Sequence, residues 1–235
     1  MHGKIDAGAL DSGPGLPPGF AAPDICSQCD LIAEADHRIA NHLALINAMV
    51  RLKAADLAKQ STEPTRGAVR LLLEGVRAQI GAVSRLHRSL SSNARRQSVD
   101  LGEHLHEACA PFALDMPGEI ILVEDFRPGC DVRPDQILPL IQIVTEVVIN
   151  ALKHSQAIGE VGRIVVSCRR DEGGMVRIEV VDDGRGLPAN VDPATNGGLG
   201  FRLLRLLAKR LGAAIEFEPA APGLRFRLTL GPGAA

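Results

Sequence analysis

Apolar residues recur at a helical period through the first third of the chain. Between residues 26 and 60 two sets of positions each repeat every seven residues (Ile32, Ile39, Ile46 and Leu43, Val50, Leu57). Their steps of three and four are the seam of a coiled coil or helix bundle. Residues 61–65 break the pattern, and a second apolar row predicts a helix over 66–92. A hairpin of this kind leaves one apolar face uncovered, so we expect a homodimer that forms a four-helix bundle.

Beyond residue 96 the pattern changes to a mixture of helices and strands. The helices are predicted at 101–114, 134–153 and 200–211, and the strands at 120–123, 161–169, 175–181, 214–218 and 224–230. Residues 171–174 (Asp-Glu-Gly-Gly) are a hairpin turn signal between two of the strands. Consecutive strands with several helices favour an α+β sandwich in which one face of the sheet packs on helices.

The predicted organisation has three parts, and the fold class is α plus α/β. Residues 1–25 form a flexible tail rich in Gly and Pro, residues 26–95 a helical dimerisation hairpin, and residues 96–235 the sandwich domain. With 235 residues, the chain is long enough for two small domains that each bury a core.

Composition excludes several function classes. A net charge of −2 predicts neither nucleic acid nor an anionic membrane surface as a partner. No apolar run approaches the roughly 20 residues that span a bilayer, and no secretory signal is visible, so we expect a cytoplasmic protein without membrane insertion. Cys26 and Cys29 could be half of a zinc site or a redox pair, but a second pair is missing, which favours incidental thiols.

The first pattern that suggests chemistry is the acidic turn at 182–188. Asp182 and Asp183 end a predicted strand, and Gly184 and Gly186 follow. Glycines allow a ligand to approach the backbone closely, and a carboxylate at the base of a pocket can accept a hydrogen bond from an exocyclic amine. Taken alone, the motif also fits an ordinary Asp-Gly turn.

A second pattern is the glycine-rich segment before the helix at 200–211. Gly198, Leu199 and Gly200 lead into that helix. Free backbone N–H groups at a helix start, together with the helix dipole, attract phosphate oxygens. A flexible loop before a helix is the ordinary explanation.

The third pattern is a polar pair on the apolar helix 134–153. Glu146 and Asn150 lie four residues apart and so share one face. Polar side chains among so many apolar ones need partners, and a metal–phosphate site would supply them. Lys153 and His154 add donor groups at the end of the same helix.

The fourth pattern is a histidine on the first helix. His37 is flanked by Glu34 and Asn41, three residues before it and four after it. A neutral imidazole is a competent nucleophile near neutral pH, and a neighbouring carboxylate can orient it or take its proton. A lone helical histidine is otherwise an ordinary surface residue.

The order and spacing of the four patterns together resemble the two-component sensor histidine kinases, in particular the subfamily with an H-R-x-x-N phosphoacceptor box related to the HWE kinases. Glu34, His37, Arg38 and Asn41 match the phosphoacceptor box, and residues 145–154 match the N box. Asp182-x-Gly184-x-Gly186 matches the G1 box and Gly198-Leu199-Gly200 the G2 box. The resemblance extends over about residues 30–230.

That resemblance implies a Bergerat-type ATP site with ATP and Mg²⁺ as cofactors. It implies that Asp182 reads the adenine amino group, that Asn150 holds Mg²⁺, and that Glu146 assists as a catalytic residue. It further implies that Lys153 contacts phosphate and that the glycines of both boxes shape the site. The γ-phosphoryl group would go to His37, with Glu34 and Asn41 as its catalytic neighbours, and then to an Asp of a response regulator.

Two departures keep alternatives open. The lid between the two glycine boxes, residues 189–197, is short, and no sensor domain is recognisable, which suggests a separate sensor protein. One alternative is a histidine phosphotransferase that relays phosphoryl groups through His37 without ATP. Another is an ATPase or anti-sigma kinase of the same fold, against which the H-R-x-x-N helix argues.

Overall fold

The computed structural model describes residues 25–59, 63–92, 98–113, 120–154, 162–188, 191–193, 195 and 198–232, with their side chains except at 25–38, 56, 59, 89–92 and 199. Arg38–Ala235 forms one compact unit and Met1–His37 another. The packing below belongs to the first unit. The predicted tail, residues 1–25, lies outside this description except for Ile25, where the first helix begins.

Two long helices precede the sheet, as the heptad pattern predicts. They are α1 (Ile25–Lys59) and α2 (Arg66–Ser92). Thr65 begins the second helix, because its hydroxyl Oγ1 accepts the backbone N–H of Ala68 at 3.2 Å, as a capping residue does. Helix α2 buries a continuous stripe at helical spacing, formed by Gly75, Ala78, Gln79, Ala82, Val83 and Leu86. This stripe packs on the helices of the sandwich domain rather than on α1 alone.

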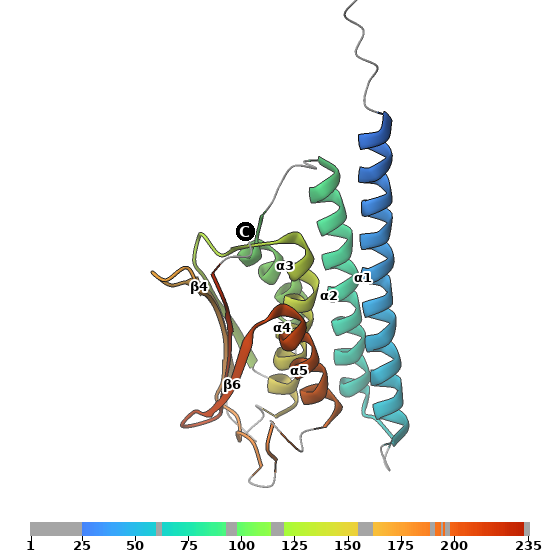
Figure 1. Cartoon of the computed structure of the whole chain (residues 1–235). Helices are drawn as coiled ribbons and strands as arrows, with labels where there is room; N and C mark the ends of the chain where they lie inside the picture. Colours follow the sequence, from blue (N-terminus) through green and yellow to red (C-terminus); the bar gives the residue numbers. More distant parts are fainter. Residues whose placement is uncertain are drawn as a thin grey trace, which may run out of the picture. The chain divides into compact units, whose positions relative to one another are not determined.

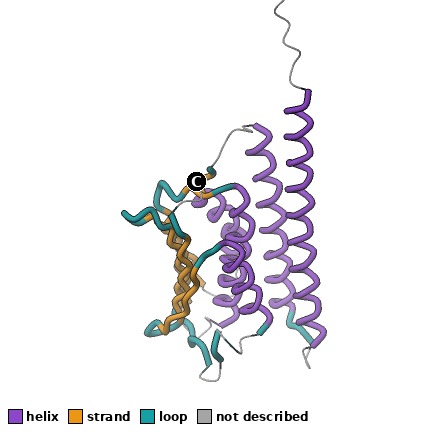
Figure 2. Tube along the Cα trace, viewed as in Figure 1, coloured by secondary structure: helices purple, strands orange, loops and turns teal. Residues whose placement is uncertain are grey.

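The sandwich domain contains a five-stranded sheet of order β2-β4-β5-β7-β6. Figure 2 shows the strands (orange) gathered in one layer beside the helices of the domain (purple). Its strands are β2 (Ile120–Phe126), β4 (Gly162–Arg170), β5 (Val176–Asp182), β6 (Ala214–Pro219) and β7 (Leu224–Leu230). The β2–β4 pair is parallel and the other pairs are antiparallel. Alternating residues of β4, β5 and β7 are fully buried, which places one face of the sheet against the helices.

Three helices cover that face (Figure 1). They are α3 (Leu101–Ala113), α4 (Pro134–His154) and α5 (Leu199–Leu211). Asp100 caps α3, because its carboxylate accepts the backbone N–H of Gly102 at 2.7 Å. Gly212 ends α5 in the left-handed conformation, with φ of 64°. The predicted fold class, a helical hairpin followed by an α+β sandwich, is confirmed.

Helix α4 is the central helix of the core. Nearly all its residues from Gln136 to Leu152 are buried. Among the described helices it is the one long and apolar enough to cross a membrane by length and composition, and 89% of its most apolar window is covered by the rest of the protein. Such burial is that of a core helix, which explains its composition without a membrane.

The structure adds two short strands that the sequence pattern does not indicate. A two-residue strand β1 (Val99–Asp100) pairs antiparallel with β3 (Asp131–Val132), directly before α3 and α4. Elements of two residues are too short for any alternation of apolar and polar positions. Strand β2 also extends three residues beyond the predicted end at 123, because Phe126 still pairs with Cys168 although two acidic residues interrupt the apolar run.

Candidate functional site

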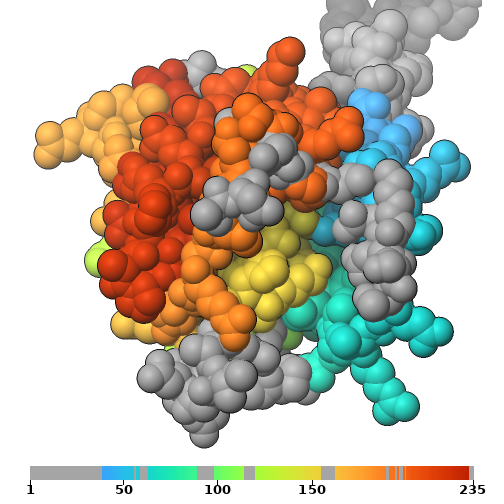
Figure 3. Space-filling view, turned by 90° about the horizontal axis from the view of Figure 1, so that it is seen from below, coloured from blue at the N-terminus to red at the C-terminus, as the bar shows by residue number. Residues whose placement is uncertain are grey.

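A cavity of about 530 Å³ opens between α4, the end of β5, the start of α5 and the β6–β7 hairpin. Figure 3 shows the face on which the end of α4 (yellow) is exposed between the segment after β5 (orange) and the two hairpin helices (blue and teal). The polar and glycine residues that line the cavity are Lys53, Glu146, Asn150, Lys153, His154, Asp182, Arg185, Gly186, Gly198 and Gly200. It is large enough for a nucleotide-sized ligand.

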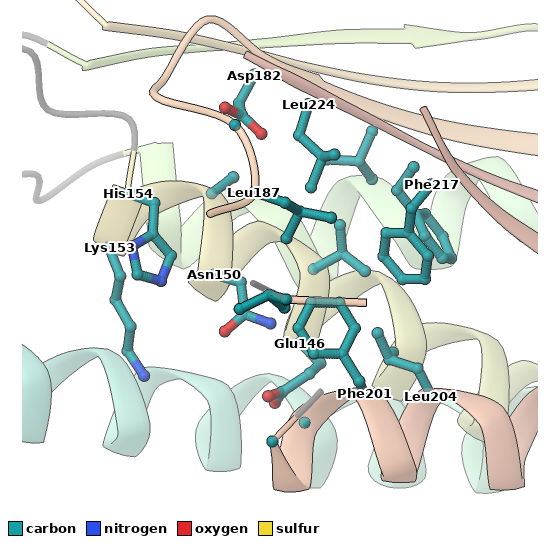
Figure 4. Close-up of a pocket in the computed structure, with 18 of the residues that line it drawn as sticks. Glu146, Asn150, Lys153, His154, Asp182, Leu187, Phe201, Leu204, Phe217 and Leu224 are labelled. Carbon is teal, nitrogen blue, oxygen red and sulfur yellow. The ribbon is translucent and has the colours of Figure 1, made fainter. Parts of the chain in front are cut away.

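Glu146 and Asn150 reach the cavity from successive turns of α4 (Figure 4). Glu146 is only 5% exposed, and its carboxylate lies at the first turn of α5. A Cβ on Gly200 would stand 2.6 Å from Glu146 Oε1, so the helix start can approach the carboxylate only because residue 200 has no side chain. The backbone N–H groups and dipole of α5 therefore face the same point as the Glu146 and Asn150 side chains.

Asp182 forms the opposite wall, at the end of β5 (Figure 4). It is 8% exposed, and its Oδ1 accepts the backbone N–H of Gly184 at 2.9 Å. Burial raises the pKa of the Asp182 carboxyl above its usual value, and hydrogen bonds from the backbone of Gly184 and Leu224 partly offset this. A buried carboxylate with its second oxygen towards the cavity can accept a hydrogen bond from an amine.

The β6–β7 turn is pressed against the backbone of Asp182. Gly223 has φ of 100°, and a Cβ there would lie 1.8 Å from the carbonyl oxygen of Asp182. Gly186, with φ of 69°, meets the Gly223 carbonyl from the other side. Both positions require glycine, since other residues are strained at such φ values. The two glycines bring the acidic turn and the hairpin together and so fix the position of Asp182.

Between these walls the cavity is apolar. Leu187, Phe201, Leu204, Phe217 and Leu224 surround its centre (Figure 4). Phe201 and Phe217 pack edge to face with ring centroids 5.2 Å apart. An apolar slot beside a single buried carboxylate suits a flat heterocycle that carries an amino group.

The two lysines that line the cavity, Lys53 and Lys153, lie at the other end, near Glu146. Lys53 of α1 places its Nζ 2.6 Å from Oε1 and 2.5 Å from Oε2 of Glu146. Lys153 and His154 are exposed at the end of α4, where Lys153 extends away from Asp182 (Figure 4). Cations and a helix start at this end, opposite the apolar slot, match a ligand with an apolar ring and an anionic tail.

The predicted site residues divide into two groups. Glu146, Asn150, Lys153, Asp182, Gly186, Gly198 and Gly200 all line the one cavity, and Gly184 is buried beside Asp182. Leu199 begins α5, although its side chain lies outside the described atoms. The side chains of Glu34 and His37 also lie outside the described residues, and only their helical backbone is placed. Asn41 is exposed on α1 and does not line the cavity.

Several cavity residues escape the sequence analysis. Phe217 and Leu224 belong to strands where alternating apolar residues are expected anyway, so nothing in the pattern marks them as ligand-facing. Phe201 stands beside the predicted glycines, which was a usable signal. No signal in the sequence marks Lys53 as a cavity residue, because it lies 93 residues from Glu146 and on a helix predicted for dimerisation.

The cysteines of the described segments are structural. Cys109, Cys130 and Cys168 are free and buried. Burial raises the pKa of the Cys109 thiol to about 12 and also raises the pKa of Cys168, so neither thiol ionises near neutral pH. The side chains of Cys26 and Cys29 lie outside the described residues, and their role stays open.

These features define a nucleotide-binding domain of the kinase–ATPase class. They are a sheet covered by helices on one face, a strand that ends in an acidic residue, and a helix that begins at glycines, all around one cavity. Residues 135–233 match the family described as histidine kinase-, DNA gyrase B- and HSP90-like ATPase, and residues 34–113 match a histidine kinase family. The chain belongs to the histidine kinases. In this family in general, the matched N-terminal segment forms the dimer and passes the phosphoryl group to a response regulator.

Proteins similar to this chain are named as histidine kinases. The chain is 28% identical to blue-light-activated histidine kinase 2 of Erythrobacter litoralis over 86% of its length, and 29% identical to the sensor histidine kinase PdtaS of Mycolicibacterium smegmatis over 75%. It spans 57% and 34% of those two proteins. The solved histidine kinase domain of the blue-light-activated histidine kinase from Erythrobacter litoralis is 25% identical, with a TM-score of 0.63 over 88% of this chain and 94% of that one. These relatives lend no support to a phosphotransferase that works without ATP.

Proposed function

We propose that this chain is an ATP-dependent protein-histidine kinase. It transfers the γ-phosphoryl group of ATP to His37 and then to an Asp of a response-regulator receiver domain. The observation that carries the proposal is the convergence of Glu146, Asn150, Asp182 and Gly200 on one cavity with an apolar slot and a helix start. The two family matches, one to the phosphoacceptor segment and one to the ATPase domain, support it.

In this proposal the cavity holds ATP with its adenine in the apolar slot. Asp182 accepts a hydrogen bond from the adenine amino group, since it is the buried acceptor beside that slot. Gly184 and Gly186 shape the turn that carries it. Gly198, Leu199 and Gly200 present backbone N–H groups of the α5 start to the phosphates, and Lys153 adds a positive charge at the same end.

The donor set fits Mg²⁺ shared with the phosphates. The Glu146 carboxylate lies at the α5 start, and the Asn150 amide lines the same cavity one turn further along α4, where phosphate oxygens would supply further ligands. Mg²⁺ in phosphoryl-transfer sites is held by one or two protein oxygens plus phosphates and water rather than by an all-protein cage. The described residues include no group of three or more His, Cys, Asp or Glu around one point, which agrees with that arrangement. The ion would neutralise charge on the transferred group.

The acceptor in this proposal is His37 on the helical backbone of α1. A neutral imidazole nitrogen of His37 would attack the γ-phosphorus of ATP as the bond to the β–γ bridging oxygen breaks and ADP leaves, and Glu34 and Asn41 would orient the ring or help remove its proton. Positioning dominates such catalysis, because the transition state is loose and needs alignment and charge neutralisation more than covalent assistance.

We further propose a cytoplasmic homodimer. The tail (1–25), the dimerisation hairpin (26–95) and the ATP-binding domain (96–235) are its proposed domains. The support for a dimer is a set of exposed apolar side chains on the outer faces of α1 and α2: Leu43, Val50, Val69, Leu73 and Ile80, each at least 38% exposed. A second copy would cover them.

The test is incubation of the purified protein with Mg²⁺ and γ-labelled ATP. We expect protein-bound label that is lost in acid, as a phosphoramidate is, and that is absent in His37→Ala with an unchanged fold by circular dichroism. Acid-labile label that persists in His37→Ala would contradict the site assignment. No label at all, with His37 still accepting phosphoryl groups from a phosphorylated regulator, would replace the kinase by a relay protein.

A further inference from the structure

Helix α1 makes a charged contact inside the nucleotide cavity that the proposed reaction does not explain. Lys53 Nζ lies within 2.6 Å of both carboxylate oxygens of Glu146. The Lys53 side chain is 20% exposed and that of Glu146 5%, so the pair is largely withdrawn from water. Pairs of this kind hold two elements in one arrangement, because separating them without water or a substitute partner is costly.

The partner of Lys53 is a residue with a proposed role in the reaction. Glu146 faces the α5 start beside Asn150, where the metal and phosphates of a nucleotide would lie. A Mg²⁺ ion and the Lys53 ammonium at the same carboxylate would repel each other and share one negative charge. Binding of the metal–nucleotide and the Lys53 contact therefore oppose each other at Glu146.

Helix α1 buries fewer side chains than α2. Among its side chains from Ile39 onward that the structure describes, His42 and Met49 are buried, and Leu45 and Ile46 are partly buried against the core. Helix α2, in contrast, buries six positions and packs on α3 and α4. Lys53 therefore adds a charged contact to a limited apolar one in holding α1, whereas α2 is fixed by its apolar stripe.

The packing of α1 beside Lys53 is incomplete. A second cavity, of about 60 Å³, lies between α1, α2 and α4, with Met49 and Lys53 of α1 in its lining. Most of its other lining residues are apolar, but it also includes Gln79 and Gln142, which are 1% and 2% exposed. A space left between α1 and the helices beneath it reduces the contact that holds α1 there.

We propose that Lys53 is a latch that docks α1 on the nucleotide-free site through Glu146, and that a Mg²⁺–nucleotide releases α1 by taking Glu146 from it. The inference rests on the proposed function, because it assigns the competing ligand to that site. In the docked state Lys53 engages Glu146 and holds α1 against the nucleotide-free site. When nucleotide binds, the Lys53 ammonium returns to water and α1 is free to move.

The experiment measures the position of α1 directly, by pulsed electron spin resonance on the full chain. Spin labels are placed at Ala55, exposed on α1, and at Glu172, exposed in the β4–β5 turn, with Cys26 and Cys29 replaced by Ser. Labelled protein is mixed with excess unlabelled protein, so that each labelled chain reports only its own distance. The variants are Lys53→Met, the conservative Lys53→Arg, and Arg51→Met as a control that removes an exposed cation from the same helix.

Without nucleotide we expect one narrow distance distribution in the unsubstituted protein, in Lys53→Arg and in Arg51→Met, and a broad distribution in Lys53→Met. Mg²⁺–ADP should broaden the distribution of the unsubstituted protein in the same way. An unchanged narrow distribution in Lys53→Met without nucleotide would overturn the latch. Because no nucleotide is present in that arm, its result is independent of whether the chain is a kinase.

Calorimetry of Mg²⁺–ADP binding separates the two proposals. If Lys53 competes with nucleotide, Lys53→Met should bind ADP about two- to fivefold more tightly than the unsubstituted protein, the range expected for loss of a partly exposed ion pair. Weaker binding in Lys53→Met would make Lys53 a nucleotide ligand and overturn the latch. Absence of ADP binding in every variant would refute the proposed function and, with it, nucleotide control of α1.

Discussion

Helices α1 and α2 have the same kind of sequence but different roles in the packing. Both repeat apolar residues every seven positions, and nothing in the pattern ranks one above the other. In the structure α2 buries a stripe of six residues on the sandwich domain, including Leu86 with no exposed surface. The described part of α1 buries two side chains and leaves Leu43 56% exposed.

The difference shows that an amphipathic period identifies a face that needs covering but not what covers it. Helix α2 has two such faces, since Leu73 and Ile80 remain 60% and 52% exposed opposite the buried stripe. One face is satisfied within the chain, and the other, together with the exposed row of α1, is available to a second copy. Helix α2 is therefore part of the sandwich core, whereas α1 is attached by fewer apolar side chains together with the charged contact of Lys53.

Truncation of one leucine on each helix tests whether α1 and α2 differ in packing. Leu86→Ala on α2 removes a fully buried side chain from the core and should reduce the free energy of unfolding by about 2–5 kcal/mol. Leu43→Ala on α1 should change it by about 0.5 kcal/mol or less at protein concentrations where the dimer dissociates. Urea titrations of both variants, followed by circular dichroism, measure the two values. A loss at Leu43 as large as that at Leu86 would show that α1 is packed as firmly as α2.

How much of this was visible in the sequence depends on the range of the interaction. The four-residue spacing of Glu146 and Asn150 placed them on one face of α4, because helical geometry is local. The same holds for the glycine start of α5 and the acidic end of β5. The sequence could not show that α2 packs on α4. Nor could it show that Lys53 contacts Glu146, 93 residues further along the chain, since such contacts depend on how whole elements dock.

A second experiment tests whether the exposed face of α2 binds a second copy of the chain. Leu73→Glu and Ile80→Glu place carboxylates in the row proposed to meet a second copy. Each buried Leu or Ile contributes about 1.5–3 kcal/mol, so each substitution should weaken self-association by at least about tenfold. Sedimentation equilibrium measures the change. Leu206→Glu on α5, where the leucine is 63% exposed, is the matched control and should leave association unaffected. Equal weakening by all three would mean that charge alone, rather than this face, controls association.

The smallest expected effect concerns Asp182. Its burial lowers the stability of the fold, whereas the burial of Leu86 raises it. Burial raises the pKa of Asp182, so the ionised carboxylate costs stability in the nucleotide-free protein. Below the unfolded-state pKa, about 4, the group is protonated in both states and costs nothing. The cost appears as pH rises through the folded-state pKa. Asp182→Asn should therefore raise the melting temperature relative to the unsubstituted protein at neutral pH and lose that advantage towards pH 4.

The same substitution should weaken ATP binding, because an amide cannot present the carboxylate's charge and second acceptor oxygen to an amino group. Melting curves between pH 4 and 8 and calorimetric ATP titrations test the two effects separately. A stability difference that does not depend on pH would show that the Asp182 charge is not what costs stability. Unchanged ATP affinity would remove Asp182 from the nucleotide site. The two effects together would show a residue kept buried for its ligand at the expense of the fold, the reverse of the apolar stripe on α2.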